Sequence, residues 1–470
     1  MVKMKNRILS FILLMTVAVS SFSVSAFADA ISNKSVGDTI YTEQYSDEVE
    51  QAGDFLKDIL ALIDQKYVGD VSVKDLVKGA ISGMTEKLDK YSQFLEEDEF
   101  NALIQDTTNT NVGIGISYYE KFENGYPLIT NVYEGSPAEK AGIVKNDVLK
   151  SVDGVDVKNK TGEEITSIIT AKTGQTIKVV IERNGTSKEL SVTIGNFITP
   201  TVFVSKLQTL ETGLNLDNTK ADKVRYIQIS QFDDATGEEF KKVVADLKKQ
   251  NVEGIIIDLR FNGGGVTQAA YEMCEALVKE GPFLNIRTKD GNYTVNSEDK
   301  DVPFKNIAVL INGATASASE LVTAVLKDNG ADIIGEKSYG KGVTQAIMQL
   351  TNLGALKLTV EEFSPMSGRK INESGVLPNY EVKQIALITT EEDDIDKALE
   401  NALKQLGYDV ETNEKKIAVI KELQKKYNLT QTGQITNETI GAINSEIVAA
   451  NYKNDTVLNK AIEVIFNKMK

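Results

Sequence analysis

Two hydrophobic periods follow one another in the second half of the chain, and together they predict alternating strands and helices. Residues 255–260 and 307–311 contain short apolar runs of the kind that buried parallel strands show. After the second run, apolar residues recur at helical spacing over 321–326, and Gly330 supplies a helix stop. These patterns indicate a mixed α/β core.

The rest of the chain divides into further regions by the same criteria. Residues 1–30 have basic residues before a mostly apolar run and end in A-x-A, which predicts a signal peptide, with an uncleaved membrane anchor as the alternative. Residues 46–107 show helical spacing, 111–195 show glycine turns and strand alternation, and 197–406 hold the α/β pattern. Residues 411–470 are helical again. We expect the body of the protein outside the cytoplasm, secreted or attached to a bacterial cell envelope.

The composition of the chain excludes several kinds of catalytic, metal and disulfide site. The chain has no histidine, which excludes a Ser-His-Asp triad, a Cys-His pair and a histidine metal site. Cys274 is the only cysteine, so an intramolecular disulfide cannot form. The formal net charge of −16 argues against nucleic acid and anionic membranes as partners.

Without histidine, a serine nucleophile needs another base, and lysine is the known substitute. Ser317 follows the strand pattern at 307–311, and Lys341 lies between two glycines. A lysine acts as a base only where burial or positive neighbours lower its pKa. The alternatives are simpler: Ser317 and Glu320 form an S-x-x-E capping box, and a lysine in a glycine loop is commonly a solvated charge.

The segments A-T-A-S-A-S-E and G-E-K-S-Y-G-K-G-V-T-Q resemble the signature of the C-terminal processing peptidases, or tail-specific proteases. The resemblance implies that Ser317 is the nucleophile, Lys341 the general base, and Gln345 the residue that orients the lysine. The family commonly has serine where this chain has threonine, two residues before the nucleophile. The rival candidates for the catalytic roles are Thr315, Ser319 and Lys337.

The run D-L-R-F-N-G-G-G at 258–265 resembles the family's D-L-R-x-N-x-G-G motif. Glycines leave backbone N–H groups accessible, as an oxyanion hole requires. The resemblance implies one donor from Gly264 or Gly265 and a second from Ala318. We expect Arg260 to pair with a carboxylate beneath the site.

Residues 111–195 resemble a PDZ domain, most specifically in the run S-P-A-E-K-A-G-I at 136–143. Such domains bind a peptide as an added strand and hold its terminal carboxylate with converging N–H groups. The residues expected to bind the peptide are Val112, Gly113, Ile114, Gly115 and Ile116.

The family resemblance covers residues 50–405 and implies an α/β multidomain protein. Its protease core would have the mixed α/β fold of the ClpP/crotonase type, with an inserted PDZ domain and helical N- and C-terminal segments. Residues 420–439 resemble a small peptidoglycan-binding repeat, and the alternative is a helical tail that packs on the protease or on a second subunit.

The resemblance predicts an exported serine endopeptidase that recognises apolar C-terminal tails of protein substrates. No cofactor or metal is implied, and a homodimer is a further expectation from the family. The rival hypotheses are a catalytically inactive PDZ adaptor in the cell envelope and a signal-peptidase-like Ser-Lys hydrolase.

Overall fold

The structure is a computed structural model that describes residues 46–119, 125–170, 172–388, 394–427 and 429–469. The expected signal segment at 1–30 lies outside the described residues. Among the described helices, none is both long enough and apolar enough to cross a membrane.

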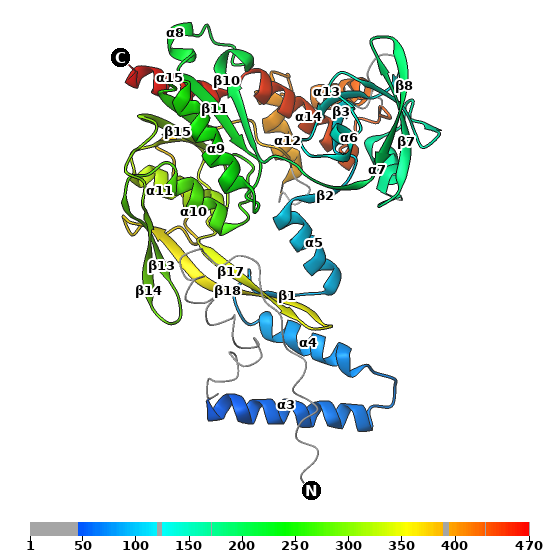
Figure 1. Cartoon of the computed structure of the whole chain (residues 1–470), viewed down its shortest axis with the longest axis vertical. Coiled ribbons are helices and arrows are strands. Elements are labelled where there is room, and N and C mark those ends of the chain that lie inside the picture. The colour runs from blue at the N-terminus through cyan, green and yellow to red at the C-terminus, as the bar shows by residue number, and fades with distance from the viewer. Residues whose placement is uncertain (1–45, 120–124, 171, 389–393, 428, 470) are drawn as a thin grey trace.

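The centre of the molecule is a six-stranded sheet (Figure 1). The two apolar runs found in the sequence form neighbouring parallel strands in it, as expected. The first strand is antiparallel to the second, and the other neighbours are parallel. In spatial order the strands are β10 (Val202–Lys206), β11 (Val224–Ile229), β12 (Gly254–Asp258), β15 (Asn306–Ile311), β16 (Asp332–Gly335) and β19 (Tyr380–Glu381).

Helices cover both faces of this sheet, because alternate residues of its strands point to opposite sides. Ile255 and Ile257 pack in the same core as α9 (Thr236–Lys249), α10 (Thr267–Glu275) and α11 (Ala318–Asp328). Ile256 packs with residues of α15 (Thr456–Lys468) in a second core. The short helix α8 (Asn218–Ala221) contributes to that second core as well.

A second sheet lies beside the first and carries the long hairpin of β17 and β18 (Figure 1). The strand β18 also pairs with a short strand from the N-terminal region, where Gln93 is opposite Lys357. This pairing attaches the N-terminal region to the core. The strands are β1 (Gln93–Leu95), β13 (Gly281–Arg287), β14 (Asn292–Ser297), β17 (Val343–Leu350) and β18 (Gly354–Pro365).

Three helices precede the region at 111–195 that is expected to be a PDZ domain. They are α3 (Asp47–Lys66), α4 (Val73–Thr85) and α5 (Glu97–Thr108). No residue of α3 is buried, and Figure 1 shows this helix at the far end of the molecule from the central sheet.

The region expected to be a PDZ domain has its own hydrophobic core and its own sheet, in the order β3-β4-β5-β7-β8. The strand β2 pairs with β9 where the chain enters and leaves this region. The elements are β2 (Thr110–Gly113), β3 (Ile116–Tyr119), β4 (Leu128–Val132), α6 (Pro137–Lys140), β5 (Val148–Val152), β6 (Val155–Asp156), α7 (Gly162–Thr170), β7 (Thr176–Arg183), β8 (Thr186–Thr193) and β9 (Gly195–Ile198).

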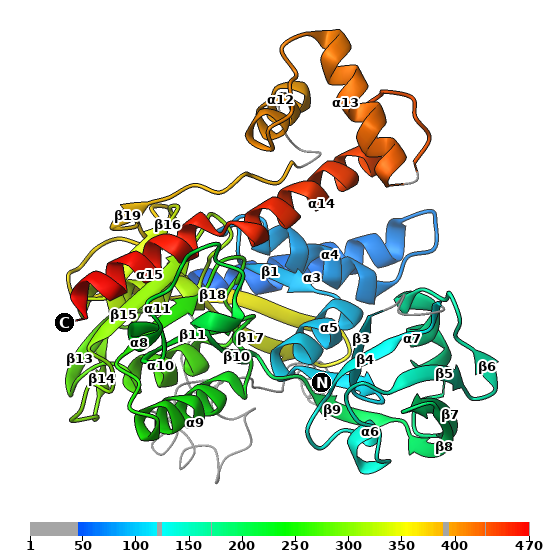
Figure 2. The same ribbon diagram turned by 90° about the horizontal axis from the view of Figure 1, so that it is seen from above.

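The C-terminal packing differs from the expected division into a core at 197–406 and a tail at 411–470. The helix α12 (Ile395–Gln405) packs with α13 (Asn413–Lys426) and α14 (Asn437–Lys453) around a separate apolar core, away from the sheet (Figure 2). The last helix, α15, instead belongs to the core around the central sheet, because its apolar stripe covers one face of that sheet. Sequence periodicity identified these helices but not the surface that each one covers.

Candidate active site

Ser317 lies on the sharp turn between β15 and α11. Its φ of 57° and ψ of −120° are unfavourable for a residue with a side chain, and the usual helix cap has extended backbone instead. The capping box with Glu320 is also present. A serine on a strained strand-to-helix turn is typical of a nucleophile, whose hydroxyl such a turn exposes.

Glu320 joins the two loops that carry the candidate nucleophile and base. Its side chain is fully buried, and one oxygen, Oε2, accepts the N–H groups of Ser317 at 3.0 Å and Lys341 at 2.7 Å. The other oxygen, Oε1, accepts the N–H of Gly340 at 2.7 Å and the hydroxyl of Ser338 at 2.5 Å. Four donors satisfy this buried carboxylate, so it fixes the backbone around both candidate residues.

The side chain of Lys341 is partly buried, and its Nζ lies 5.2 Å from the centre of the Tyr91 ring. None of the ion pairs among the described residues includes this amine. Burial, and to a smaller extent the charge of Lys357, lower the pKa of Lys341 to about 8, while Asp89 and Glu320 act in the opposite direction. An appreciable fraction of the amine is therefore neutral near pH 8.

Tyr91 is held over Lys341 by the segment that leads into β1. One oxygen of Asp89 accepts the N–H groups of Tyr91 at 2.7 Å and Ser92 at 2.9 Å. The hydroxyl of Ser92 accepts the N–H of Thr359 on β18 at 3.0 Å. The Tyr91 hydroxyl is buried without a hydrogen-bond partner in the described structure.

Gln345 lies on β17, close in sequence to Lys341. Its amide nitrogen donates to the Thr359 hydroxyl at 3.2 Å. The expected contact with the lysine amine is not among the hydrogen bonds of the described residues. The structure therefore brings Gln345 to the β17–β18 hairpin without placing its amide on the base.

The glycine loop lies directly against the turn that carries Ser317. A Cβ on Gly264 would lie 2.7 Å from the Ala316 carbonyl oxygen and 2.8 Å from the Ala318 nitrogen. The N–H of Gly264 already donates to the Asn262 side chain at 2.9 Å. In the described structure, the N–H groups of Gly265 and Ala318 have no such partner. Of the two expected glycines, Gly265 is thus the one whose donor is free to bind an oxyanion.

Asn262 holds the glycine loop in position. Its side chain is fully buried, and its amide donates to the Ile229 carbonyl at 2.8 Å. The backbone carbonyl of Asn262 accepts the N–H of Ala316 at 3.1 Å. One asparagine therefore connects a strand of the central sheet, the glycine loop and the turn before Ser317.

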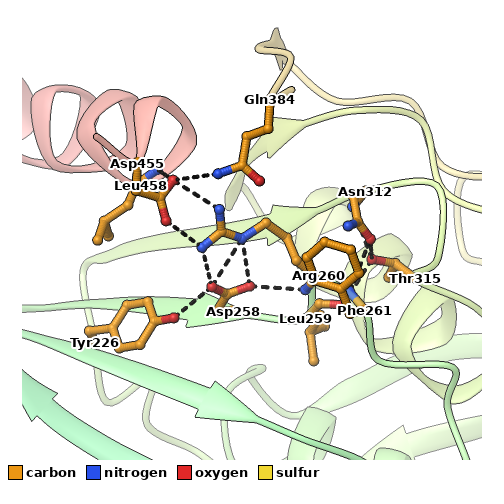
Figure 3. A network of polar contacts seen from close by, with 10 residues as sticks. All are labelled: Tyr226, Asp258, Leu259, Arg260, Phe261, Asn312, Thr315, Gln384, Asp455 and Leu458. Carbon is orange, nitrogen blue, oxygen red and sulfur yellow. Dashed lines mark hydrogen bonds and ion pairs between the residues drawn. The ribbon is translucent and has the colours of Figure 1, made fainter. Parts of the chain in front are cut away.

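Arg260 pairs with two carboxylates, as expected from the sequence (Figure 3). Its guanidinium contacts Asp258, and it also reaches Asp455 with two hydrogen bonds of 2.9 and 2.7 Å. Asp455 caps α15 by accepting the N–H of Leu458 at 3.0 Å, and the hydroxyl of Tyr226 donates to Asp258 at 2.6 Å. The ion pairs fasten the end of β12 to the C-terminal helix.

The rival catalytic residues have less suitable surroundings. The Thr315 hydroxyl is buried and donates to the Leu259 carbonyl at 2.8 Å. Ser319 is fully buried in α11, and Lys337 is exposed. Neither hydroxyl lies on a turn that exposes it, as Ser317 does, and Lys337 is not desolvated as Lys341 is.

The expected peptide-binding residues lie at the start of the region 111–195. Val112 and Gly113 are in β2, and Ile116 begins β3, which is an outer strand of its sheet. Ile114 is 2% exposed and belongs to the core. Gly115 has a φ of 79°, and a Cβ there would lie 2.3 Å from the Cβ of Ser136, so the loop packs closely on the helix α6.

Sequence reasoning missed several residues that build this site. The sequence pattern assigns Glu320 only to a capping box and Asn262 only to the glycine motif, and it indicates no role for Tyr91. The available signal for Glu320 is a glutamate directly before an apolar helical pattern, three residues after the candidate serine. Asp455 had no local signal, because its partner Arg260 lies 195 residues away.

Three family models match successive parts of the chain. They are the CtpB-like activating protease N-terminal domain over residues 14–99, the PDZ domain over 112–194, and peptidase family S41 over 223–382.

Curated relatives match along nearly the whole chain. The carboxy-terminal processing protease CtpA of Bacillus subtilis is 28% identical, with 99% of this chain and 100% of the relative aligned. CtpB of the same organism is 29% identical over 90% of this chain and 91% of its own. Among solved structures, the photosystem II D1 C-terminal processing protease is 24% identical with a TM-score of 0.40, covering 70% of this chain and 87% of that one.

The matched models and relatives agree with the order of regions in the chain. The expected protease family and PDZ domain are confirmed, and the fold is the mixed α/β arrangement described above. Residues 223–382 are a peptidase family S41 domain and residues 112–194 are a PDZ domain, and along nearly its whole length the chain is similar to serine proteases of the carboxy-terminal processing type.

Proposed function

We propose that the protein is an endopeptidase that uses a Ser317–Lys341 dyad to cleave exported proteins, whose C-terminal tails its PDZ domain recognises. The observation that carries the dyad is the buried carboxylate of Glu320, which accepts backbone N–H groups from both residues. This contact supports a shared catalytic frame, because it fixes two loops that are separate in the sequence.

In the proposed mechanism, neutral Lys341 takes the proton from the Ser317 hydroxyl while the oxygen attacks the scissile carbonyl. The N–H groups of Gly265 and Ala318 stabilise the resulting oxyanion. The lysine then gives its proton to the leaving amine. Water hydrolyses the acyl-enzyme with Lys341 again as the base.

The environment of Lys341 supports this role. The amine is desolvated and takes part in none of the ion pairs among the described residues, and desolvation favours the neutral form. The family resemblance assigns Gln345 the orientation of the amine. In that role its Oε1 would accept an N–H of the lysine amine, while its Nε2 donates to the Thr359 hydroxyl.

The outer position of β3 supports peptide binding by the PDZ domain. A strand at the edge of a sheet has unpaired backbone groups that an extended peptide can use. The glycines at 113 and 115 lie at the entrance to this strand, where a terminal carboxylate would bind. An apolar tail would place its last side chain against the apolar core beneath.

The test is cleavage of one unstructured protein made with either an apolar or a charged C-terminus. We expect the apolar-tailed form to be cleaved faster, and Ser317→Ala and Lys341→Ala to abolish cleavage of both forms. Undiminished cleavage by either variant would refute the dyad. Tail binding without cleavage by any form would instead support the inactive PDZ adaptor.

A further part of the proposal concerns the oligomeric state. The helix α3 exposes a row of apolar side chains, which supports a homodimer formed through this region. Light scattering tests this, and Phe55→Glu with Leu62→Glu is expected to give the monomer. The exposed residues are Val49, Phe55, Leu56, Ile59 and Leu62.

The three-helix unit of α12, α13 and α14 has its own apolar core, which supports a separate binding module. We propose peptidoglycan as its ligand and the cell envelope as the place of action. Sedimentation of the protein with purified peptidoglycan tests this directly, and failure to co-sediment would leave the unit with a packing role only.

A further inference from the structure

Some residues in the loops of the candidate active site have positive φ angles although their side chains disfavour this backbone conformation. Ten non-glycine residues of the described chain have one, and seven of these are asparagine or aspartate, which tolerate this backbone well. The three exceptions are Phe261 at 62°, Ser317 at 57° and Glu373 at 62°. All three border the candidate site, since the Glu373 N–H donates to the carbonyl of Gly340 beside Lys341 at 2.7 Å.

Phe261 is unfavourable in two ways at once. A bulky side chain at positive φ strains the backbone, and an aromatic ring in solvent gives up the stabilisation of burial. The ring is 65% exposed. The fold therefore gains nothing evident from phenylalanine at this position, where asparagine or glycine would fit with less strain.

The backbone of Phe261 is nevertheless fixed beside the nucleophile. Its N–H donates to the side chain of Asn312 at 3.0 Å, and Asn312 begins the turn that leads to Ser317. The next residue, Asn262, accepts the N–H of Ala316. Figure 3 shows Phe261 next to Asn312 and Thr315. The exposed ring is thus located on the rim of the turn that presents the nucleophile.

We propose that Phe261 is a specificity-determining residue whose ring contacts an apolar substrate side chain near the scissile bond. The inference rests on the proposed protease function of this site. An aromatic face binds aliphatic and aromatic side chains by burying their apolar surface, and a polar side chain gains little from it. Substrate binding supplies the burial that the free protein lacks.

The test compares the full-length protein with its Phe261→Asn variant on paired peptides. The members of a pair differ only in one residue near the cleaved bond, which is leucine in one peptide and serine in the other. We expect the variant to lose about tenfold in kcat/KM on the leucine peptide, mainly through KM, with little change on the serine peptide. We also expect its melting temperature to be equal to or higher than that of the wild type, because asparagine tolerates positive φ.

A purely structural role for Phe261 predicts a lower melting temperature and equal losses on both peptides, and either result would overturn the inference. Phe203→Asn is the matched control, because Phe203 is 45% exposed on the outer strand β10 and should leave the preference intact. Wild-type protein that cleaves neither peptide would overturn the protease function and this inference together. Wild-type cleavage with an unchanged preference in the variant would overturn the inference alone.

Discussion

One carboxylate oxygen of Glu320 accepts the backbone N–H groups of both Ser317 and Lys341, at 3.0 and 2.7 Å. These two residues are the proposed nucleophile and base. Because the carboxylate is fully buried and has two further donors on its other oxygen, it is a rigid connection between the two loops. Catalysis by a dyad requires such fixed geometry.

Glu320→Gln tests this connection. The variant keeps one acceptor oxygen but replaces the other with an amide group that cannot accept, so buried donors lose their partners. We expect the free energy of unfolding to fall by about 1–3 kcal/mol. We also expect kcat to fall far more than KM rises, which steady-state kinetics on a peptide would measure. A normal kcat in folded protein would show that the connection is unnecessary.

The pH dependence of activity follows from the environment of Lys341. Since burial lowers its pKa to about 8 and the neutral form is the active one, kcat/KM should rise with pH and reach half its maximum near pH 8. Stability should also rise from about pH 8 toward the ordinary lysine value of 10.5, because in this window the unfolded chain binds the additional proton.

Lys357→Gln changes that profile in a known direction. The positive charge of Lys357 lowers the pKa of Lys341, so its removal should move the rise in kcat/KM to higher pH. Lys289→Gln, in the loop between β13 and β14, makes the same change in net charge and should leave the profile in place. A shift to lower pH would contradict the assignment of Lys341 as the base.

Alanine substitutions at Gly265 and Gly263 test the proposed oxyanion donor, because the two glycines lie in the same loop but have different surroundings. A Cβ at Gly265, where φ is 134°, would lie 1.9 Å from the carbonyl oxygen of Phe232, whereas a Cβ at Gly263 would meet nothing within 4 Å. Gly265→Ala should therefore displace the proposed oxyanion donor and reduce kcat by about 10²–10³-fold. Gly263→Ala should remain close to the wild type, and equal losses in both variants would argue against this donor.

Asp455→Asn tests the attachment of the C-terminal helix. The change removes the ion pair to Arg260, which is buried against β12, while asparagine still caps α15. We expect a loss of about 3 kcal/mol in the free energy of unfolding, measured in urea. Glu463→Gln on the same helix breaks only an exposed pair with Lys460 and should have little effect.

Local sequence patterns predicted the strands and helices of the core well. Residues 307–311 and 255–258 form strands because their apolar runs fit a sheet that helices cover on both faces. The same patterns could not show that α15 covers the sheet while α12 joins a separate core. Both helices have an apolar stripe, and the choice of partner depends on contacts between distant segments.

The candidate site was predictable where its residues lie in contiguous motifs. Ser317, Lys341 and the glycine loop were identified in this way, and their roles stay predictions. The supporting residues were not predictable, because Tyr91 reaches Lys341 from a segment 250 residues earlier, and only the pairing of β1 with β18 brings it there. The strain at Phe261 is likewise a property of the folded backbone and not of any residue pattern.

The central claim is that Ser317 is a nucleophile activated by Lys341. The most direct test is the rate at which a fluorophosphonate probe modifies the protein as a function of pH, with the modified residue identified by mass spectrometry. The account predicts a single adduct on Ser317, a rate that reaches half its maximum near pH 8, and a large loss of rate in Lys341→Ala. Modification at Thr315 or Ser319, or an unchanged rate in Lys341→Ala, would contradict it.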